Sequence, residues 1–245
     1  MNGPLPERTP AQVPGLPGEG LRERKKRLMR QQLSDTATAM FLERGFDGVR
    51  VAEVAAACGV SEKTAFNYFP VKEALVMDRL EGALAALSAG LADPARTPVQ
   101  AALAVLGQEL AAMTAGLAAQ DNLGQGRDAV RRFGDLIRAT PALRAYQADM
   151  TDQAAAAAAR VLAARAGMTA DDPEPEIAAR ALLGLWRVQA DSLRRHLDRT
   201  ATPALLHEQV TADVRRAARL IDTGLRTFAA PRDRSPATAS PPRCG

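Results

Sequence analysis

The stretch from residue 51 to residue 72 constrains the fold of this chain more than any other part of its sequence. Val54 and Cys58 stand four residues apart in an apolar pattern that predicts a short helix with one buried face. Gly59 can adopt the left-handed backbone conformation that ends many helices. Ser61 then supplies a hydroxyl that can cap the start of a following helix. The stretch therefore predicts two short helices joined by a tight turn.

The second of these helices has two different faces. Ala65 and Phe69 are four residues apart and are expected to point inward. Lys63 and Asn67 share the opposite face, with Thr64 at its edge. A short polar helix supported by a small apolar helix is the arrangement that enters the major groove of DNA. Lys63, Thr64 and Asn67 are therefore predicted to contact base edges.

The net charge of the chain is only +4, but positive charge is concentrated just ahead of this motif. Residues 21–30 contain Glu23 and the basic residues Arg22, Arg24, Lys25, Lys26, Arg27 and Arg30. Between residues 81 and 230 the basic and acidic side chains balance. This asymmetry favours a domain that neutralises phosphates, joined to one that does not. A solvated basic helix face is the alternative interpretation, and the neighbouring motif makes it the weaker one.

Three motifs in register resemble the TetR family of transcriptional regulators. They are FLERGF at residues 41–46, VAAACGVS at 54–61 and TAFNYFPVKEAL at 64–75. The resemblance covers about residues 22–80. It implies an all-α fold, with an N-terminal three-helix helix-turn-helix DNA-binding domain and a C-terminal helical domain for ligand binding and dimerisation. Phe66 departs from the family pattern, which usually has a phosphate-contacting tyrosine there, although Tyr68 keeps a hydroxyl two residues later.

Residues around the predicted helix-turn-helix are expected to hold the DNA backbone. The predicted backbone contacts are Arg24, Lys25, Arg50, Ser61, Tyr68 and Lys72. Arg50 stands where the family often has threonine, and we expect its charge to serve the same purpose. Contacts to phosphates set the register of a protein on the duplex, while base contacts specify the sequence.

Composition extends the all-α prediction along the whole chain. Alanine and leucine are abundant and aromatic residues make up only 4%, which favours helices over strands. Pro and Gly divide the sequence into helices at about 21–44, 71–91, 97–119, 125–139, 141–167, 174–198 and 203–229. The predicted organisation is a disordered arm at 1–20, a DNA-binding domain at 21–80 with its helix-turn-helix at about 50–69, an effector-binding and dimerisation domain at 81–230, and a disordered tail at 231–245.

The resemblance implies an effector pocket among the C-terminal helices. The residues proposed to line it are Trp186, Tyr146, Phe133, Met113 and Met150. Trp186 and Tyr146 are the stronger candidates, because each joins a large apolar body to a polar group. Plain core packing also explains most of these residues. The sequence leaves the effector class open between lipid-like, drug-like and polar molecules.

The resemblance also implies dimerisation through the last two helices. The last predicted helix has an apolar stripe at near-heptad spacing, which suits packing against other helices. Val214, Ile221 and Leu225 of this stripe are the candidates for a dimer interface.

Catalysis and metal binding have little support in the sequence. The two histidines, His196 and His207, lie beside Arg and Glu near a joint between predicted helices, and no Cys or third His has ligand spacing. No glycine-rich phosphate loop or nucleophile elbow occurs. The chain is therefore predicted not to be an enzyme and to need no cofactor or metal.

The sequence also predicts a cytoplasmic protein without a membrane partner. The apolar run at 101–119 carries Gln108 and Glu109 at its middle, which indicates a core helix rather than a membrane span. The first residues lack the apolar segment of a signal peptide.

These patterns together predict a homodimeric DNA-binding regulator. We expect a repressor that leaves a palindromic double-stranded operator when an unidentified small-molecule effector binds. Two-fold symmetry would place the two base-contacting helices about one DNA turn apart, roughly 34–36 Å or somewhat more. A helical ligand carrier or scaffold without DNA binding is the alternative from another class. Activation instead of repression stays open, because it depends on where the operator lies relative to the promoter.

Overall fold

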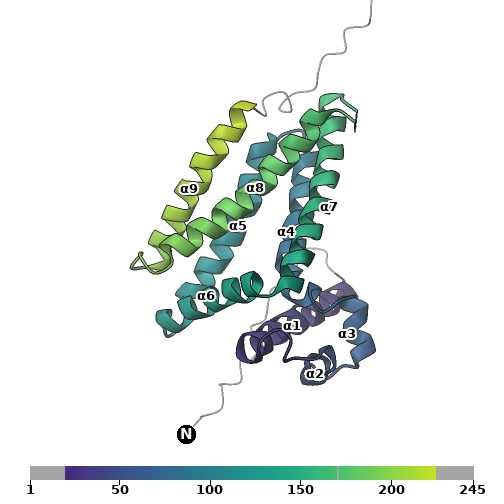
Figure 1. Ribbon diagram of the computed structural model, residues 1–245, viewed down its shortest axis with the longest axis vertical. Coiled ribbons are helices and arrows are strands. Elements are labelled where there is room, and N and C mark those ends of the chain that lie inside the picture. Colours follow the sequence, from purple (N-terminus) through teal and green to yellow (C-terminus); the bar gives the residue numbers. More distant parts are fainter. Residues whose placement is uncertain (1–19, 170, 225–245) are drawn as a thin grey trace, which may run out of the picture. The chain divides into compact units, whose positions relative to one another are not determined.

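The computed structural model describes residues 20–169 and 171–224. Every regular element within these ranges is a helix, which confirms the all-α prediction (Figure 1). The helices are α1 (Leu21–Arg44), α2 (Val51–Ala57), α3 (Glu62–Tyr68), α4 (Ala74–Ala92), α5 (Pro98–Ala118), α6 (Leu123–Ala139), α7 (Pro141–Ala166), α8 (Pro173–His196) and α9 (Pro203–Gly224). The predicted arm up to residue 19, the predicted tail at 231–245 and Leu225 lie outside the described residues.

Local residue chemistry explains most helix ends. Thr97 caps α5, because its side chain accepts a 3.1 Å hydrogen bond from the backbone N–H of Gln100, whose side chain accepts the N–H of Thr97 in return. Gly59, with φ of 71°, and Gly167, with φ of 66°, take the left-handed conformation that stops α2 and α7. These signals are local in the sequence, and the helix boundaries follow from them.

The start of α4 differs from the prediction. The sequence predicted a helix from residue 71, whereas α4 begins at Ala74. Residues 71–73 form a tighter turn, in which the N–H of Ala74 donates to the carbonyl of Val71 at 3.3 Å and that of Leu75 donates to Lys72 at 3.2 Å. Pro70 stands just before this turn, where its fixed φ suits a change of direction.

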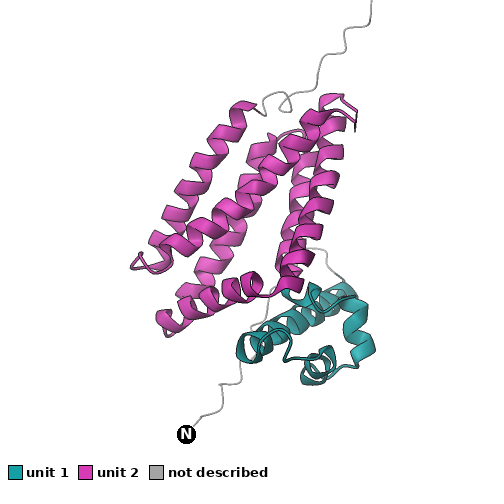
Figure 2. Ribbon diagram, viewed as in Figure 1, with its two compact units in different colours: residues 1–76 teal, residues 77–245 magenta. Residues whose placement is uncertain are grey.

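The chain divides into two compact units, residues 1–76 and 77–245 (Figure 2). In the first unit, α1, α2 and α3 pack around a small core. Leu33 and Phe41 come from α1, Val54 comes from α2 and Phe69 follows α3, and each is at most 1% exposed. Burying a side chain of this size contributes roughly 1.5–3 kcal/mol. The apolar residues of the sequence motif are thus the ones that hold this unit together.

The second unit is a bundle in which α8 packs against both α7 and α9, while α5 packs against α8 and α9 (Figure 1). Leucines fill its centre: Leu106 from α5, Leu162 from α7, Leu182 from α8 and Leu206 from α9 are all at most 1% exposed. The alanine-rich middle of α7 places Ala155 and other small residues in the same core. Small side chains let α7 lie close to α8.

The length and composition of α5 alone would allow it to cross a membrane. Such a helix is weak evidence for a membrane span, because core helices pass the same test. Leu106, Leu110 and Leu117 of α5 are between 1% and 4% exposed and belong to the main core. These residues pack one side of α5 into the core of the second unit.

Candidate nucleic-acid interface

The helix α3 is fixed by its inner face and by its N-terminal cap. Ala65 is 0% exposed and Phe69 is 1% exposed, so this side is anchored in the core of the first unit. The Oγ of Ser61 accepts a 3.1 Å hydrogen bond from the backbone N–H of Thr64. The residues that place α3 are therefore separate from those on its opposite side.

The opposite side, which we call the outer face of α3, consists of the exposed residues Glu62, Lys63, Phe66 and Asn67. Lys63 and Asn67 were predicted to contact bases. Sequence reasoning missed Glu62, although its four-residue spacing from Phe66 was a usable signal. Thr64 and Asn67 can each donate and accept, whereas an ionised carboxylate here only accepts, and cytosine N4 is a donor that it could match.

Thr64, the third residue predicted to contact bases, is only partly exposed. Its Oγ1 lies 2.8 Å from the Oγ of Ser61, so the two hydroxyls share a hydrogen bond within the turn. The structure thus gives Thr64 a local structural contact in addition to its place beside the outer face.

A cleft of about 800 Å³ opens between the N-terminal part of α1 and α3. Its lining residues are Leu21, Arg22, Glu23, Lys25, Lys26, Met29, Thr64, Asn67 and Tyr68. We call it the basic cleft. Four predicted DNA contacts meet here, namely Lys25, Thr64, Asn67 and Tyr68, whereas Arg24 is not among the lining residues. Arg22 and Lys26 add two cations that suit a phosphate.

Arg30, from the same basic segment, holds the end of α3. One guanidinium nitrogen donates a 3.0 Å hydrogen bond to the backbone carbonyl of Tyr68. The guanidinium also lies 4.5 Å from the centroid of the Phe69 ring, which is a cation–π distance. The side chain therefore ties α1 to the C-terminal end of α3.

Arg50 is placed at the start of α2 with its side chain 85% exposed. Its backbone N–H donates a 2.8 Å hydrogen bond to the carboxylate of Glu53, which also accepts a hydrogen bond from Arg44 at 2.8 Å. These contacts, the backbone bond first, hold the pKa of Glu53 below its ordinary value. Glu53 thus fixes the backbone of Arg50 and lies 3.6 Å from its guanidinium Nε, while most of the Arg50 side chain stays exposed.

Lys72 makes contacts inside the first unit that the sequence did not predict. Its Nζ donates a 2.5 Å hydrogen bond to the carbonyl of Phe46 and lies 4.3 Å from the centroid of the Phe46 ring. It also lies 5.5 Å from the Phe41 ring centroid. Lys72 therefore secures the turn that follows α1.

All five residues predicted to line an effector pocket are partly exposed in the second unit: Trp186, Tyr146, Phe133, Met113 and Met150. Trp186 has a polar partner that sequence reasoning missed. Its Nε1–H donates a 2.9 Å hydrogen bond to the carboxylate of Glu109 on α5. Burial raises the pKa of Glu109, while the bond from Trp186 and the charge of Arg79 act in the opposite direction.

The residues predicted for a dimer interface lie in different environments. Val214 is 3% exposed and belongs to the core of a single chain, so its side chain is not on the surface. Ile221 is partly exposed and packs beside that core. Leu220 on α9 is 83% exposed and Ile177 on α8 is 66% exposed. Leu205, near the start of α9, is 43% exposed. These three are the exposed large apolar side chains of α8 and α9.

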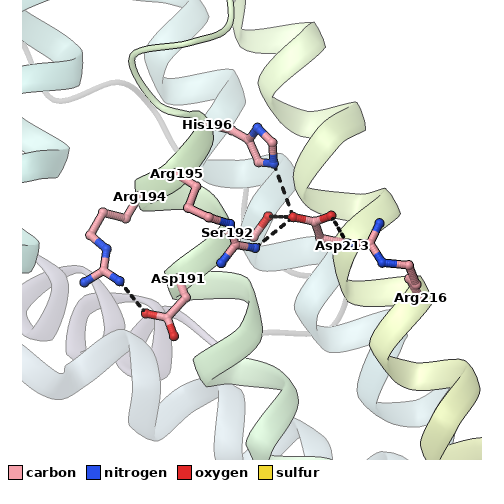
Figure 3. Close-up of polar contacts among 7 residues, drawn as sticks. All are labelled: Asp191, Ser192, Arg194, Arg195, His196, Asp213 and Arg216. Atoms are coloured by element: carbon pink, nitrogen blue, oxygen red, sulfur yellow. Dashed lines mark hydrogen bonds and ion pairs between the residues drawn. The ribbon is translucent and has the colours of Figure 1, made fainter.

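A polar cluster joins α8 to α9 (Figure 3). Asp213, whose side chain is 12% exposed, accepts hydrogen bonds from Ser192 at 2.7 Å and from Arg195 at 2.9 Å. His196 Nε2 lies 3.2 Å away and Arg216 binds the other carboxylate oxygen at 2.7 Å. These bonds, that of Ser192 first, hold the pKa of Asp213 far below its ordinary value. The cluster is a structural clamp, and within the described ranges no three His, Cys, Asp or Glu side chains gather as metal ligands do.

An anchored short helix with a polar outer face, beside a basic cleft, defines a helix-turn-helix DNA-binding protein. Comparison with known proteins supports this assignment. Residues 33–77 match the model of the bacterial regulatory proteins of the tetR family, and residues 120–218 match the MftR C-terminal domain. The chain is 31% identical to the HTH-type transcriptional regulator TcmR of Streptomyces glaucescens over 163 residues, which are 63% of this chain and 68% of TcmR.

Two solved structures are more distant. A TetR-family transcriptional regulator from Streptomyces coelicolor has 24% identity, covers 86% of this chain and 88% of its own, and gives a TM-score of 0.34. A protein from Mesorhizobium loti assigned to the same family has 18% identity, covers 80% of this chain and 98% of its own, and gives a TM-score of 0.32. On the family model and the similarity to TcmR, the chain belongs to the TetR family of transcriptional regulators.

Proposed function

We propose that this chain is a homodimeric repressor that binds a palindromic DNA operator and leaves it when a small-molecule effector binds. The observation that carries the proposal is the outer face of α3 next to the basic cleft. Polar groups that can meet base edges stand there beside cations that can meet phosphates. Residues 21–80 would form the DNA-binding domain, and residues 81–230 would bind the effector and the second copy.

In this proposal the outer face of α3 lies in the major groove. Lys63 and Asn67 contact base edges, with Thr64 at the margin and Glu62 as an additional acceptor. The phosphate contacts come from Arg24, Lys25, Arg50, Ser61, Tyr68 and Lys72. Arg50 and Lys25 are the best supported of these contacts, because the Arg50 side chain is 85% exposed and Lys25 lines the basic cleft.

Dimerisation would use the exposed sides of α8 and α9. Leu220 and Ile177 are large apolar groups that solvent reaches in a single chain. Ile221 lies next to Leu220 and would extend the same surface. A two-fold axis through this surface would pair two α3 helices with two inverted half-sites. Val214 would support the interface from within the chain instead of contacting the partner.

Effector release would work through a shift between two conformers of the dimer. A ligand shifts such an equilibrium only as far as it binds one conformer more tightly than the other. We place the effector among Trp186, Met113 and their partly exposed neighbours. The conformer that binds effector would hold the two α3 helices at a spacing that no longer matches successive grooves. The protein would act in the cytoplasm, where its operator is.

Selection of bound duplexes from a random pool tests the DNA-binding part of this proposal. We expect one selected sequence with two inverted half-sites, and an affinity that falls steeply with salt. The matched control is the double variant Lys63→Ala and Asn67→Ala, which should keep binding random DNA but lose the selected sequence. Equal affinity of the native chain for selected and random duplexes would contradict the proposal.

A further inference from the structure

The helix α5 contains one charged side chain, Glu109, in its 21 residues. All other residues of α5 are apolar, small or uncharged. Glu109 is only partly exposed, and Leu106 and Leu110 on either side of it in the sequence belong to the main core. A carboxyl group in such surroundings loses hydration, and this loss disfavours its charged form.

The described contacts of Glu109 compensate its charge only in part. Its Oε2 accepts the Nε1–H of Trp186 at 2.9 Å, and the positive charge of Arg79 also favours the carboxylate. The loss of hydration outweighs both, so the pKa of Glu109 is raised. A further positive charge beside the carboxylate would therefore be bound favourably.

The surroundings of Glu109 also suit an apolar molecule. Trp186 and Met113 are partly exposed, and both pack against the main core of the second unit. Met113 stands one helical turn after Glu109 on α5. An indole ring and a thioether next to a carboxylate are the groups that together recognise an organic cation, because the ring attracts positive charge and the flexible methionine adapts to an apolar body.

We propose that Glu109 and Trp186 form the recognition point for the effector, and that this effector is an organic cation, with a positively charged nitrogen or phosphorus centre on an apolar body. This inference rests on the proposed function for its biological role and names the ligand class of that effector. An anion of the same shape is rejected, because it would meet the Glu109 carboxylate. A neutral molecule of the same shape gains the apolar contacts alone.

The single tryptophan of the chain makes the test direct, because all indole fluorescence comes from Trp186. The full chain is titrated with tetraphenylphosphonium and with hexyltrimethylammonium, and the change in Trp186 emission is followed. Tetraphenylborate, an anion of nearly the same size and shape as tetraphenylphosphonium, is the matched ligand control. We expect saturable binding of at least one of the two cations and none of the anion in the same concentration range.

Glu109→Gln is the matched variant, since glutamine keeps a carbonyl acceptor for Trp186 and removes the charge. We expect cation binding to weaken at least tenfold. Glu208→Gln removes an exposed carboxylate from α9 of the same unit and should leave cation binding unchanged. Trp186→Phe, followed by equilibrium dialysis, should weaken binding as well. Equal cation binding by native chain and Glu109→Gln, binding of the anion, or no saturable binding of either cation would overturn the proposal.

DNA binding measured in the same samples separates this inference from the proposed function. Without ligand, Glu208→Gln should bind the selected duplex as the native chain does, and the ligand-free affinity of Glu109→Gln for the duplex is the baseline for its response to the cation. If the cation binds through Glu109 but does not weaken DNA binding, the site stands and effector release is wrong. If the native chain does not discriminate DNA sequences at all, the proposed function fails while the cation titration still decides the role of Glu109.

Discussion

The hydroxyl of Ser192 on α8 donates a 2.7 Å hydrogen bond to the carboxylate of Asp213 on α9. Ser192 is 0% exposed, and Asp213 is also bound by Arg195, His196 and Arg216. This clamp fixes α8 against α9, the two helices on which the proposed dimer depends. A single acidic residue thus gathers donors from both helices.

Asp213→Asn should therefore lower the free energy of unfolding by about 1.5–3 kcal/mol at pH 7. Because the folded pKa of Asp213 is lowered, its stabilising contribution is present above the ordinary aspartate pKa of about 3.9 and is lost as the pH falls toward the folded value. Denaturant unfolding between neutral and acidic pH measures both effects. Asp222→Asn, at an exposed site on α9, is the control. If Asp213→Asn is as stable as the native chain at pH 7, the hydrogen bonds of Asp213 do not stabilise the packing of α8 against α9.

Arg30→Lys should destabilise the first unit by about 1–2 kcal/mol, although the charge is kept. A lysine ammonium cannot reproduce the cation–π contact with the Phe69 ring together with the hydrogen bond to the Tyr68 carbonyl. Thermal unfolding and DNA affinity should fall together, because α3 loses its attachment to α1. The matched control is Arg22→Lys, which keeps the charge at an exposed position of the basic cleft. Unchanged unfolding of Arg30→Lys would show that α3 is held by other contacts.

Asn67→Ala should cost about 1–3 kcal/mol of binding free energy at the selected duplex and relax the preference at one base position. The side chain is exposed on α3, so the fold should be unaffected. Lys25→Ala, in the same cleft, should instead weaken binding to all sequences alike. Competition binding with single-base variants of the duplex measures the difference. An equal loss on selected and random DNA would contradict a base contact by Asn67.

Lys72→Met should have two separate effects. Loss of the bond to the Phe46 carbonyl should lower the stability of the first unit by about 1 kcal/mol. If the remaining donors of the ammonium meet a phosphate, as we propose, the dependence of log affinity on log salt should also flatten by about one. Unfolding curves and salt titrations separate the two. A flatter slope is the result that supports the phosphate contact, and an unchanged slope would limit Lys72 to its structural role.

Leu220→Asp should convert the proposed dimer to monomer. The side chain is 83% exposed in a single chain, so a charge there costs the folded chain little and the interface much. Sedimentation at micromolar concentration measures the change, and circular dichroism should show the same helix content. Leu21→Asp, at a leucine of α1 that is 77% exposed, is the control. A Leu220→Asp chain that sediments as the native chain does would place the interface elsewhere.

The helices could be predicted from the sequence because their ends depend on neighbouring residues. Thr97 with Gln100, and the glycines with positive φ, act within a few positions of the boundaries that they set. The start of α4 was missed because helical spacing continues through residues 71–73, whereas the backbone there turns more tightly.

Helical spacing predicted which side of α3 each residue of the site occupies, but not the contacts that its side chain makes. Spacing placed Lys63 and Asn67 on the side opposite Ala65, which is where they lie. It could not show that the Thr64 hydroxyl turns toward Ser61, because that depends on one side-chain torsion. The sequence shows that Glu109 is the only charged residue of α5. Its hydrogen bond with Trp186 could not be predicted, because Trp186 lies 77 positions away in the sequence.

Arg30, Ala65 and Phe69 anchor α3, so the residues on its outer face contribute little to the stability of the fold. Exchanges at Glu62, Lys63 or Asn67 can therefore accumulate at small thermodynamic cost. Descendants of such a gene can acquire new target sites step by step while every intermediate still folds.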